Sequence, residues 1–251
     1  MTQQPLPEER DLTVEVETGT GQLRLDLVRR LLAEGLGTGL LIVAVIGSGI
    51  MAQRLSSDIG LQLLENAIAT AGALVGLILM FGAVSGAHFN PVVTILDRLL
   101  GSISTRDAAG YVVVQIIGAC LGAMLADILF ELPAITLSTH DRSSTALWIS
   151  EIVATVTLLL VIQGCVRSGR AAVVPFAVAA WIGGAYWFTS STSFANPAVT
   201  IARTLSDTFA GIAPSSAPMF ILMQLLGMGI AFGLVKVLYP IHPNPPETPD
   251  A

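Results

Sequence analysis

Charged residues are scarce in this chain. Only 12% of its 251 residues are charged, whereas soluble chains carry about 25%. The mean hydropathy is +0.75, and 53% of the residues are hydrophobic. A chain this apolar has too little polar surface to cover a fold in water, and it is too hydrophobic to stay disordered. The scarcity of charge therefore indicates a membrane protein that crosses the bilayer several times.

Basic residues and cysteines are also few. Twelve Lys and Arg stand against eighteen Asp and Glu, so the net charge repels phosphate and no nucleic-acid partner is expected. Cys120 and Cys165 lie in apolar stretches, where small buried side chains are expected rather than a disulfide or metal ligands. No His-Glu-x-x-His, Gly-x-Ser-x-Gly or clustered His/Cys set occurs, so we expect no enzyme, metal or cofactor.

Six uncharged runs divide the chain, at residues 35–53, 66–96, 108–125, 152–166, 171–202 and 208–235. A helix needs about 20 residues to cross a bilayer, and four of the runs suit one helix each. The other two hold 31 and 32 residues, which fits one spanning helix and a half-span that enters the membrane and stops. Such a half-span is tolerated only where it is buried in protein or lines a water-filled cavity. The run lengths therefore predict a pore or a transport site.

Both long runs contain Asn-Pro where the half-span should begin, at Asn90-Pro91 and Asn196-Pro197. Asn is a preferred helix N-cap and Pro is favoured as the first helical residue. The two dipeptides therefore predict two half-helices that start in the middle of hydrophobic sequence.

The two halves of the chain repeat each other in order. Glu34 recurs as Glu151, 117 residues later, and Asn90 recurs as Asn196, 106 residues later. Each half then holds three full spans and one half-span, and because three is odd the second half must lie inverted in the membrane. Inverted repeats with broken helices are typical of transport proteins. We expect an all-α membrane protein with six transmembrane helices and two re-entrant half-helices. Its channel domain covers 27–239 (repeats about 27–130 and 145–239), between tails 1–26 and 240–251.

The positions of Arg and Lys predict the orientation in the membrane. With the N-terminus inside, the outer segments hold only Arg54, Arg142 and Arg203. The cytoplasmic segments hold nine basic residues: Arg10, Arg24, Arg29, Arg30, Arg98, Arg106, Arg167, Arg170 and Lys236. This excess obeys the positive-inside rule, so both tails are expected in the cytoplasm.

Four stretches resemble the aquaporin (major intrinsic protein) family: Ser-Gly-Ala-His-Phe-Asn-Pro at 85–91, Asn-Pro-Ala at 196–198, and segments 33–38 and 115–119. The resemblance extends from about residue 31 to 239. It implies two half-helices that meet at their Asn-Pro-Ala tips, and a homotetramer in the lipid bilayer with one pore for small neutral solutes in each protomer. The expected location is the inner (plasma) membrane of a bacterium.

The resemblance assigns the tips of the half-helices to the pore. The motif residues are Asn90, Pro91, Val92, Asn196, Pro197 and Ala198, with Val92 in place of the usual alanine. The side-chain amides of the two asparagines are expected to donate to a permeating oxygen. The positive ends of both half-helices converge there and oppose cations and protons.

Glu34, Glu151 and His88 are expected to brace the loops before the tips. Carboxylates inside a membrane are costly unless they are satisfied, so Glu34 and Glu151 should accept hydrogen bonds from backbone N–H groups of those loops. The resemblance makes His88 a bracing residue at the cytoplasmic vestibule, with a pH gate as the alternative.

The outer constriction departs from the family pattern. Most members have arginine after the second Asn-Pro-Ala, where this chain has Val199. Ungapped alignment places the other constriction positions at Thr70 (or Ala71), Gly184 and Ser193. All of these residues are small, so a wide and weakly polar constriction is expected.

Arg203 lies one helical turn beyond Val199 on the same face. It either supplies a displaced cation at the pore mouth or lies in solvent or among lipid headgroups.

These features predict a passive channel for glycerol-like polyols and water. Valine in place of arginine resembles a bacterial subgroup associated with arsenic handling, which adds arsenite or methylated arsenicals as solutes. The alternatives are a water-selective channel and a coupled secondary transporter, which would need an ion ligand at the midplane.

Overall fold

A computed structural model describes residues 8–240 of the chain, with side chains placed from residue 26 onward. Residues 1–7 and 241–251, which belong to the expected tails, lie outside the described residues. Within the described part, all regular structure is helical. The helices are α1 (Glu8–Leu55), α2 (Ile59–Ser85), α3 (Pro91–Leu99), α4 (Thr105–Leu129), α5 (Thr145–Arg167), α6 (Val174–Phe188), α7 (Pro197–Ala202) and α8 (Ala217–Leu238).

Six of these segments are long and apolar enough to cross a membrane. They are Asp26–Leu55 of α1, then α2, α4, α5, the segment Ala171–Phe188 that includes α6, and α8. The six spans and two half-helices predicted from the sequence are therefore confirmed. Residues 8–25, assigned to the N-terminal tail, are helical and continue α1 beyond its apolar part.

The half-helices α3 and α7 have only 9 and 6 residues, too few to cross a bilayer. Each begins at proline after an asparagine N-cap in extended conformation. The Asn90 side-chain oxygen accepts a hydrogen bond from Val92 N at 3.0 Å, and that of Asn196 accepts one from Ala198 N at 3.0 Å. The caps satisfy N–H groups that have no partner within the helix.

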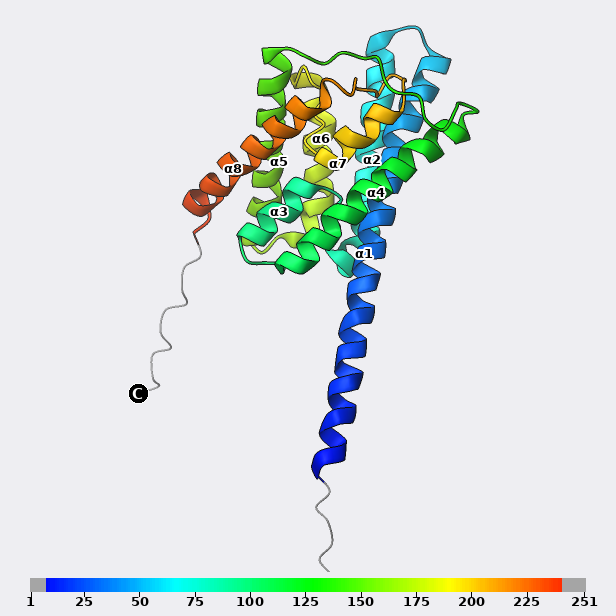
Figure 1. The fold of residues 1–251 in the computed structure, drawn as a ribbon. Coiled ribbons are helices and arrows are strands. Elements are labelled where there is room, and N and C mark those ends of the chain that lie inside the picture. The colour runs from blue at the N-terminus through cyan, green and yellow to red at the C-terminus, as the bar shows by residue number, and fades with distance from the viewer. Residues whose placement is uncertain (1–7, 241–251) are drawn as a thin grey trace, which may run out of the picture.

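The molecule has two faces, which can be followed in Figure 1. The spanning part of α1 begins and α8 ends on one face, here called the terminal face, which also carries the α3–α4 connection. The opposite face, here called the distal face, carries the α4–α5 connection and the segment between α7 and α8. Each half-helix starts in the interior, and α3 runs toward the terminal face while α7 runs toward the distal face.

Helices α1 and α4 cross at close range through glycines. A Cβ atom built on Gly118 would overlap the carbonyl oxygen of Gly35, and one on Gly122 would overlap that of Gly39. Only glycine therefore fits on α4 at this crossing. The repeat-related contact between α5 and α8 leaves more room. A Cβ built on Gly227 would lie 3.0 Å from the Cβ of Thr155, which is a tight contact but not an overlap with backbone like that at Gly118.

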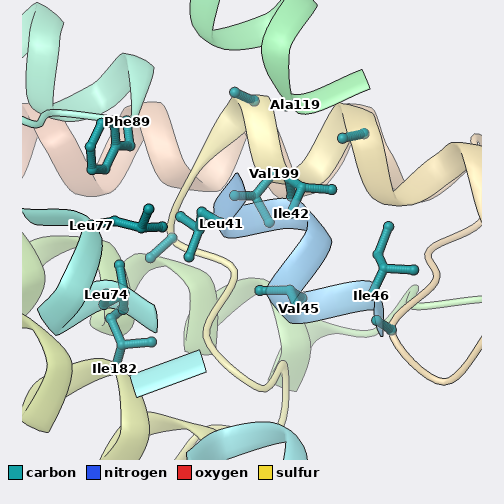
Figure 2. Close-up of a cluster of buried hydrophobic side chains, with 14 of the residues drawn as sticks. Leu41, Ile42, Val45, Ile46, Leu74, Leu77, Phe89, Ala119, Ile182 and Val199 are labelled. Atoms are coloured by element: carbon teal, nitrogen blue, oxygen red, sulfur yellow. The ribbon is translucent and has the colours of Figure 1, made fainter. Parts of the chain in front are cut away.

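The apolar core gathers around the meeting point of the half-helices. Side chains of the α1 and α2 spans, such as Ile42 and Leu74, form one buried cluster with Phe89 and Val199 from the two tips (Figure 2). Large apolar side chains such as Ile68 and Phe176 are exposed on the outside of the bundle, as expected for a surface that contacts lipid.

Candidate functional site

The two tips are joined by reciprocal hydrogen bonds in the interior of the molecule. Asn90 Nδ2 donates to the carbonyl oxygen of Ala195 at 2.8 Å, and Asn196 Nδ2 donates to that of Phe89 at 2.8 Å. From the sequence, both amides are expected to donate to a permeating oxygen, whereas in the structure one N–H of each donates to the opposite loop. Since a side-chain amide has two N–H donors, one remains on each asparagine.

Glu34 organises the loop before the first tip. Its carboxylate is completely buried and accepts hydrogen bonds from the backbone N–H groups of His88 (3.0 Å) and Phe89 (2.7 Å). Side chains of Ser85 (2.6 Å) and Gln115 (2.8 Å) donate to it as well. Four donors thus surround one carboxylate, which offsets the cost of placing it inside the membrane.

Glu151 does the same for the second loop. It is also completely buried, and it accepts hydrogen bonds from the backbone N–H groups of Phe194 (3.0 Å) and Ala195 (2.9 Å) and from Gln224 (2.6 Å).

Both braced loops hold non-glycine residues in left-handed backbone conformation. Phe89 and Ala195 have φ angles of 50° and 47°, a region that such residues rarely adopt. The carboxylate hydrogen bonds supply the surrounding structure that such a backbone requires.

His88 connects the first loop to the half-helix α3. Its Nδ1 lies 3.0 Å from the hydroxyl of Thr94, and its Nε2 lies 3.1 Å from a carboxylate oxygen of Asp97. Asp97 also accepts a hydrogen bond from Gln163 at 2.8 Å. Asp97 and Gln163 are not among the site residues predicted from the sequence, although Asp97 lies one helical turn after Thr94 on the same half-helix.

One cavity of about 660 Å³ runs past the tips. Asp97 and Ser102 line its terminal end, Asn90 and Asn196 its middle, and Arg203 its distal end. Apolar side chains form most of the remaining wall, including Leu41, Val45, Leu74, Ile78, Val178 and Ile182. The structure therefore brings the predicted tip and loop residues together along one path.

Three of the four predicted constriction residues line this cavity: Thr70, Ser193 and Val199. Gly184 is not among the described residues that line it, and a Cβ built there would point at Phe188. Tyr186 of the same helix takes this side of the wall, and its hydroxyl lies 3.1 Å from that of Thr70.

The described lining of the cavity therefore includes Tyr186 and not Gly184, so the wall is not made of small residues alone. The spacing along α6 gives the reason. Val178, Ile182 and Tyr186 follow each other at intervals of four and face the cavity, whereas Gly184 lies on another side of the helix.

Arg203 is buried, with 3% of its surface exposed, and it lines the distal end of the cavity. Its Nε donates to the carbonyl oxygen of Ala210, and its guanidinium carbon lies 3.5 Å from the centre of the Phe194 ring. This placement favours the displaced cation at the mouth over an arginine in solvent.

Two groups in the distal loops have shifted pKa values. The backbone N–H of Thr139, which donates at 2.8 Å, is the main cause that lowers the pKa of Asp207. Burial lowers the pKa of Arg142, yet the ordinary pKa of a guanidinium is so high that the group stays charged. Both groups are therefore ionised at neutral pH.

Comparisons with known proteins agree on one family. Residues 22–186 match the family model described as Major intrinsic protein. The chain is 47% identical over 228 residues to the aquaglyceroporin AqpS of Rhizobium meliloti (strain 1021), which covers 89% of this chain and 97% of that protein. It is 32% identical over 158 residues to the aquaporin NIP1-2 of Arabidopsis thaliana, covering 59% of this chain and 53% of that protein.

A solved structure shares the fold. The X-ray structure of the aquaglyceroporin from Plasmodium falciparum superposes with a TM-score of 0.65 at 19% identity, covering 85% of this chain and 98% of that chain.

Proposed function

Since the chain belongs to the major intrinsic protein family, whose aquaglyceroporins are channels and not enzymes, we propose that it conducts glycerol-like polyols, arsenite or methylated arsenicals, and water. The broader class, a channel of aquaglyceroporin type for small solutes, follows from the family and from the extent of the similarity to AqpS.

The observation that supports this proposal is that the cavity wall combines apolar side chains with hydroxyl groups. Near the distal end, Val199 and Ile182 offer apolar surface, while Thr70, Tyr186 and Ser193 offer hydroxyl groups. The Ser193 hydroxyl is buried and has no hydrogen-bond partner among the side chains that the structure places. A neutral solute with hydroxyls on one side and carbon or arsenic on the other matches both kinds of wall.

The tips support passage of neutral solutes. Each asparagine keeps one amide N–H for a permeating oxygen, and the N-terminal ends of α3 and α7 meet beside them. The partial positive charge of two converging helix ends raises the energy of a cation or proton at this point.

A coupled transporter is disfavoured by the carboxylates. Asp97 is the one carboxylate among the described residues that line the cavity, and it pairs with His88 and Gln163 near the terminal end. Glu34 and Glu151 are occupied by loop N–H groups and neighbouring side chains. A coupling ion would therefore find no free carboxylate at the midplane among the described residues.

We place the channel in the plasma membrane of a bacterium as a homotetramer, with the terminal face toward the cytoplasm. Gly72 and Gly76 support the oligomer, because they are exposed on α2 and a Cβ built on either would meet nothing within 4 Å. Small residues on a lipid-facing helix let a neighbouring helix approach closely.

Reconstituted vesicles test the proposal. Stopped-flow light scattering should show water, glycerol and urea entering faster than in empty vesicles, and arsenite uptake should rise with them. Flux should stay nearly linear with solute concentration, as in a channel. A protein that conducts water but excludes glycerol, urea and arsenite would be a water-selective channel, and a saturating flux would indicate a carrier.

A further inference from the structure

A second cavity of about 550 Å³ opens next to the channel, near the distal face. Seven of its ten described lining residues have polar or charged side chains: Gln53, Gln62, Asn66, His140, Arg142, Thr192 and Arg203. The other three are Ile59, Leu63 and Phe209, and apolar atoms supply the larger part of the lining surface. No Asp or Glu is among these residues. Arg203 lines both cavities, so the two share a wall at this side chain.

Two guanidinium groups lie close together there. The guanidinium carbon of Arg203 lies 3.5 Å from the centre of the Phe194 ring, and that of Arg142 lies 5.2 Å from the same point. The two groups are therefore no more than about 9 Å apart. Such proximity of like charges is unfavourable unless a negative charge lies between them or beside them.

Neither arginine forms an ion pair with a carboxylate among the described residues. Arg142 donates through Nε to the carbonyl oxygen of Gly211 at 2.9 Å, and Arg203 donates through Nε to that of Ala210. Each guanidinium has five N–H donors, and the terminal amino groups of both make no hydrogen bond to the described residues.

The carboxylates in this region are engaged elsewhere. Glu151 accepts hydrogen bonds from the loop beneath Phe194 and from Gln224. Asp207 accepts them from Thr139 and lies 3.6 Å from the His140 ring. The terminal amino groups of both guanidiniums are therefore left without an acceptor among the described residues, in a cavity whose described lining holds no carboxylate.

We infer that the distal cavity binds a small oxyanion between Arg142 and Arg203. Guanidinium groups match the oxygen pairs of sulfate, phosphate and carboxylate groups, and charge-assisted hydrogen bonds of this kind are strong. Gln62 in the same lining donates one amide hydrogen to the carbonyl oxygen of Ser56 and keeps a second N–H donor for a remaining oxygen. A free oxyanion and the phosphate of a lipid headgroup present the same chemistry.

Occupancy of this site affects the channel, because Arg203 belongs to both cavities. An anion held by Arg203 lies at the distal end of the solute path and obstructs entry from that face. The inference goes beyond the conduction of neutral solutes, since binding can be measured without flux.

Calorimetry on the full chain in phosphate-free detergent tests the binding. Sodium sulfate should release or absorb heat in excess of sodium chloride at equal ionic strength, which keeps screening constant. Arg142→Gln and Arg203→Lys should each weaken sulfate about tenfold, the loss expected for one charge-assisted hydrogen bond. Arg54→Gln removes an exposed arginine outside the lining and should leave the affinity unchanged. No sulfate binding by the unaltered protein, or an affinity in both cavity variants equal to that of the unaltered protein, would overturn the site.

Flux identifies the occupant. In vesicles of zwitterionic lipid, glycerol entry from the distal face should fall to about half at a sulfate concentration equal to its Kd, as mass action requires. Arg142→Gln should remove this inhibition. If anionic phosphatidylglycerol lowers the flux and abolishes the sulfate effect, the occupant is a lipid headgroup. Sulfate that binds in detergent but changes flux in neither lipid would refute the obstruction. A protein that binds sulfate yet conducts no glycerol would refute only the proposed function.

Discussion

Val199 and Arg203 give the distal part of the cavity two different surfaces. Val199 lies in the apolar cluster and lines the cavity, so it gives aliphatic surface at the point nearest the second tip. Arg203, one turn further, gives a buried cation that stacks on Phe194. The positive charge of Arg203 therefore lies about one helical turn away from the aliphatic surface of Val199. A solute that carries both hydroxyl groups and apolar surface can contact both.

Val199→Arg should narrow the channel and reduce glycerol flux more than water flux. The new side chain is long and carries five N–H donors, and it would add a third guanidinium near Arg203 and Arg142. Val199→Thr is the matched control, since it keeps the size of the side chain and should leave both fluxes nearly unchanged. Light scattering of reconstituted vesicles measures them. Equal loss of both fluxes in Val199→Arg would contradict a selective narrowing.

Glu151→Ala should destabilise the protein by about 3 kcal/mol or more, because it leaves the buried N–H groups of Phe194 and Ala195 without an acceptor. Glu151→Gln should cost less, since its amide oxygen still accepts a hydrogen bond. Thermal unfolding in mild detergent gives both values. If the two variants lose the same stability, the requirement is for negative charge and not for an acceptor.

At the scale of elements, each half-helix depends on its surroundings. Nine and six residues are too few for a helix that is stable alone in water. The asparagine cap, the proline start and the carboxylate-braced loop hold each one in place. The helices around them can cross closely only where glycine allows it, as between α1 and α4.

Gly118→Ala should destabilise the α1–α4 crossing by about 2 kcal/mol, a typical cost of overpacking, because its Cβ would overlap the Gly35 carbonyl oxygen. Gly229→Ala on α8 is the control, since a Cβ there would meet nothing within 4 Å. That change should be neutral or slightly stabilising, because alanine favours a helix more than glycine does. Thermal unfolding of both proteins in detergent compares them. A stable Gly118→Ala protein would mean that the helices can separate without cost.

On the scale of the whole molecule, the two repeats have the same arrangement of helices and loops but carry different charged residues at their ends of the channel. Both place a buried glutamate behind a loop and an asparagine at a tip. The terminal end of the channel carries the His88–Asp97 pair, whereas the distal end carries Arg203 and Arg142 without a carboxylate partner among the described residues. The path is therefore electrostatically asymmetric despite the repeat.

The terminal face should lie in the cytoplasm. Ser143→Cys, exposed in the α4–α5 connection, should react with a membrane-impermeant maleimide in intact cells. Ser168→Cys, exposed where α5 ends on the terminal face, should react only after the cells are permeabilised. The background should lack Cys120 and Cys165, which are the two natural cysteines. The reverse labelling pattern would show that the excess of Arg and Lys does not set this topology.

The sequence by itself determined the six spans, the two half-helices and the inverted repeat. These depend on the length of uncharged runs and on local Asn-Pro signals, so neighbouring residues are enough to specify them. The pairing of Glu34 and Glu151 within the repeat likewise pointed to the loops that they contact.

Tertiary structure decided what faces the solute. The orientation of α6 about its axis places Tyr186 and Ile182 on the cavity wall. Packing against Phe194 and Ala210 buried Arg203. Each tip amide donates to a loop more than 100 residues away. Helix rotation and contacts at such separation depend on how every element packs, which local sequence patterns do not encode.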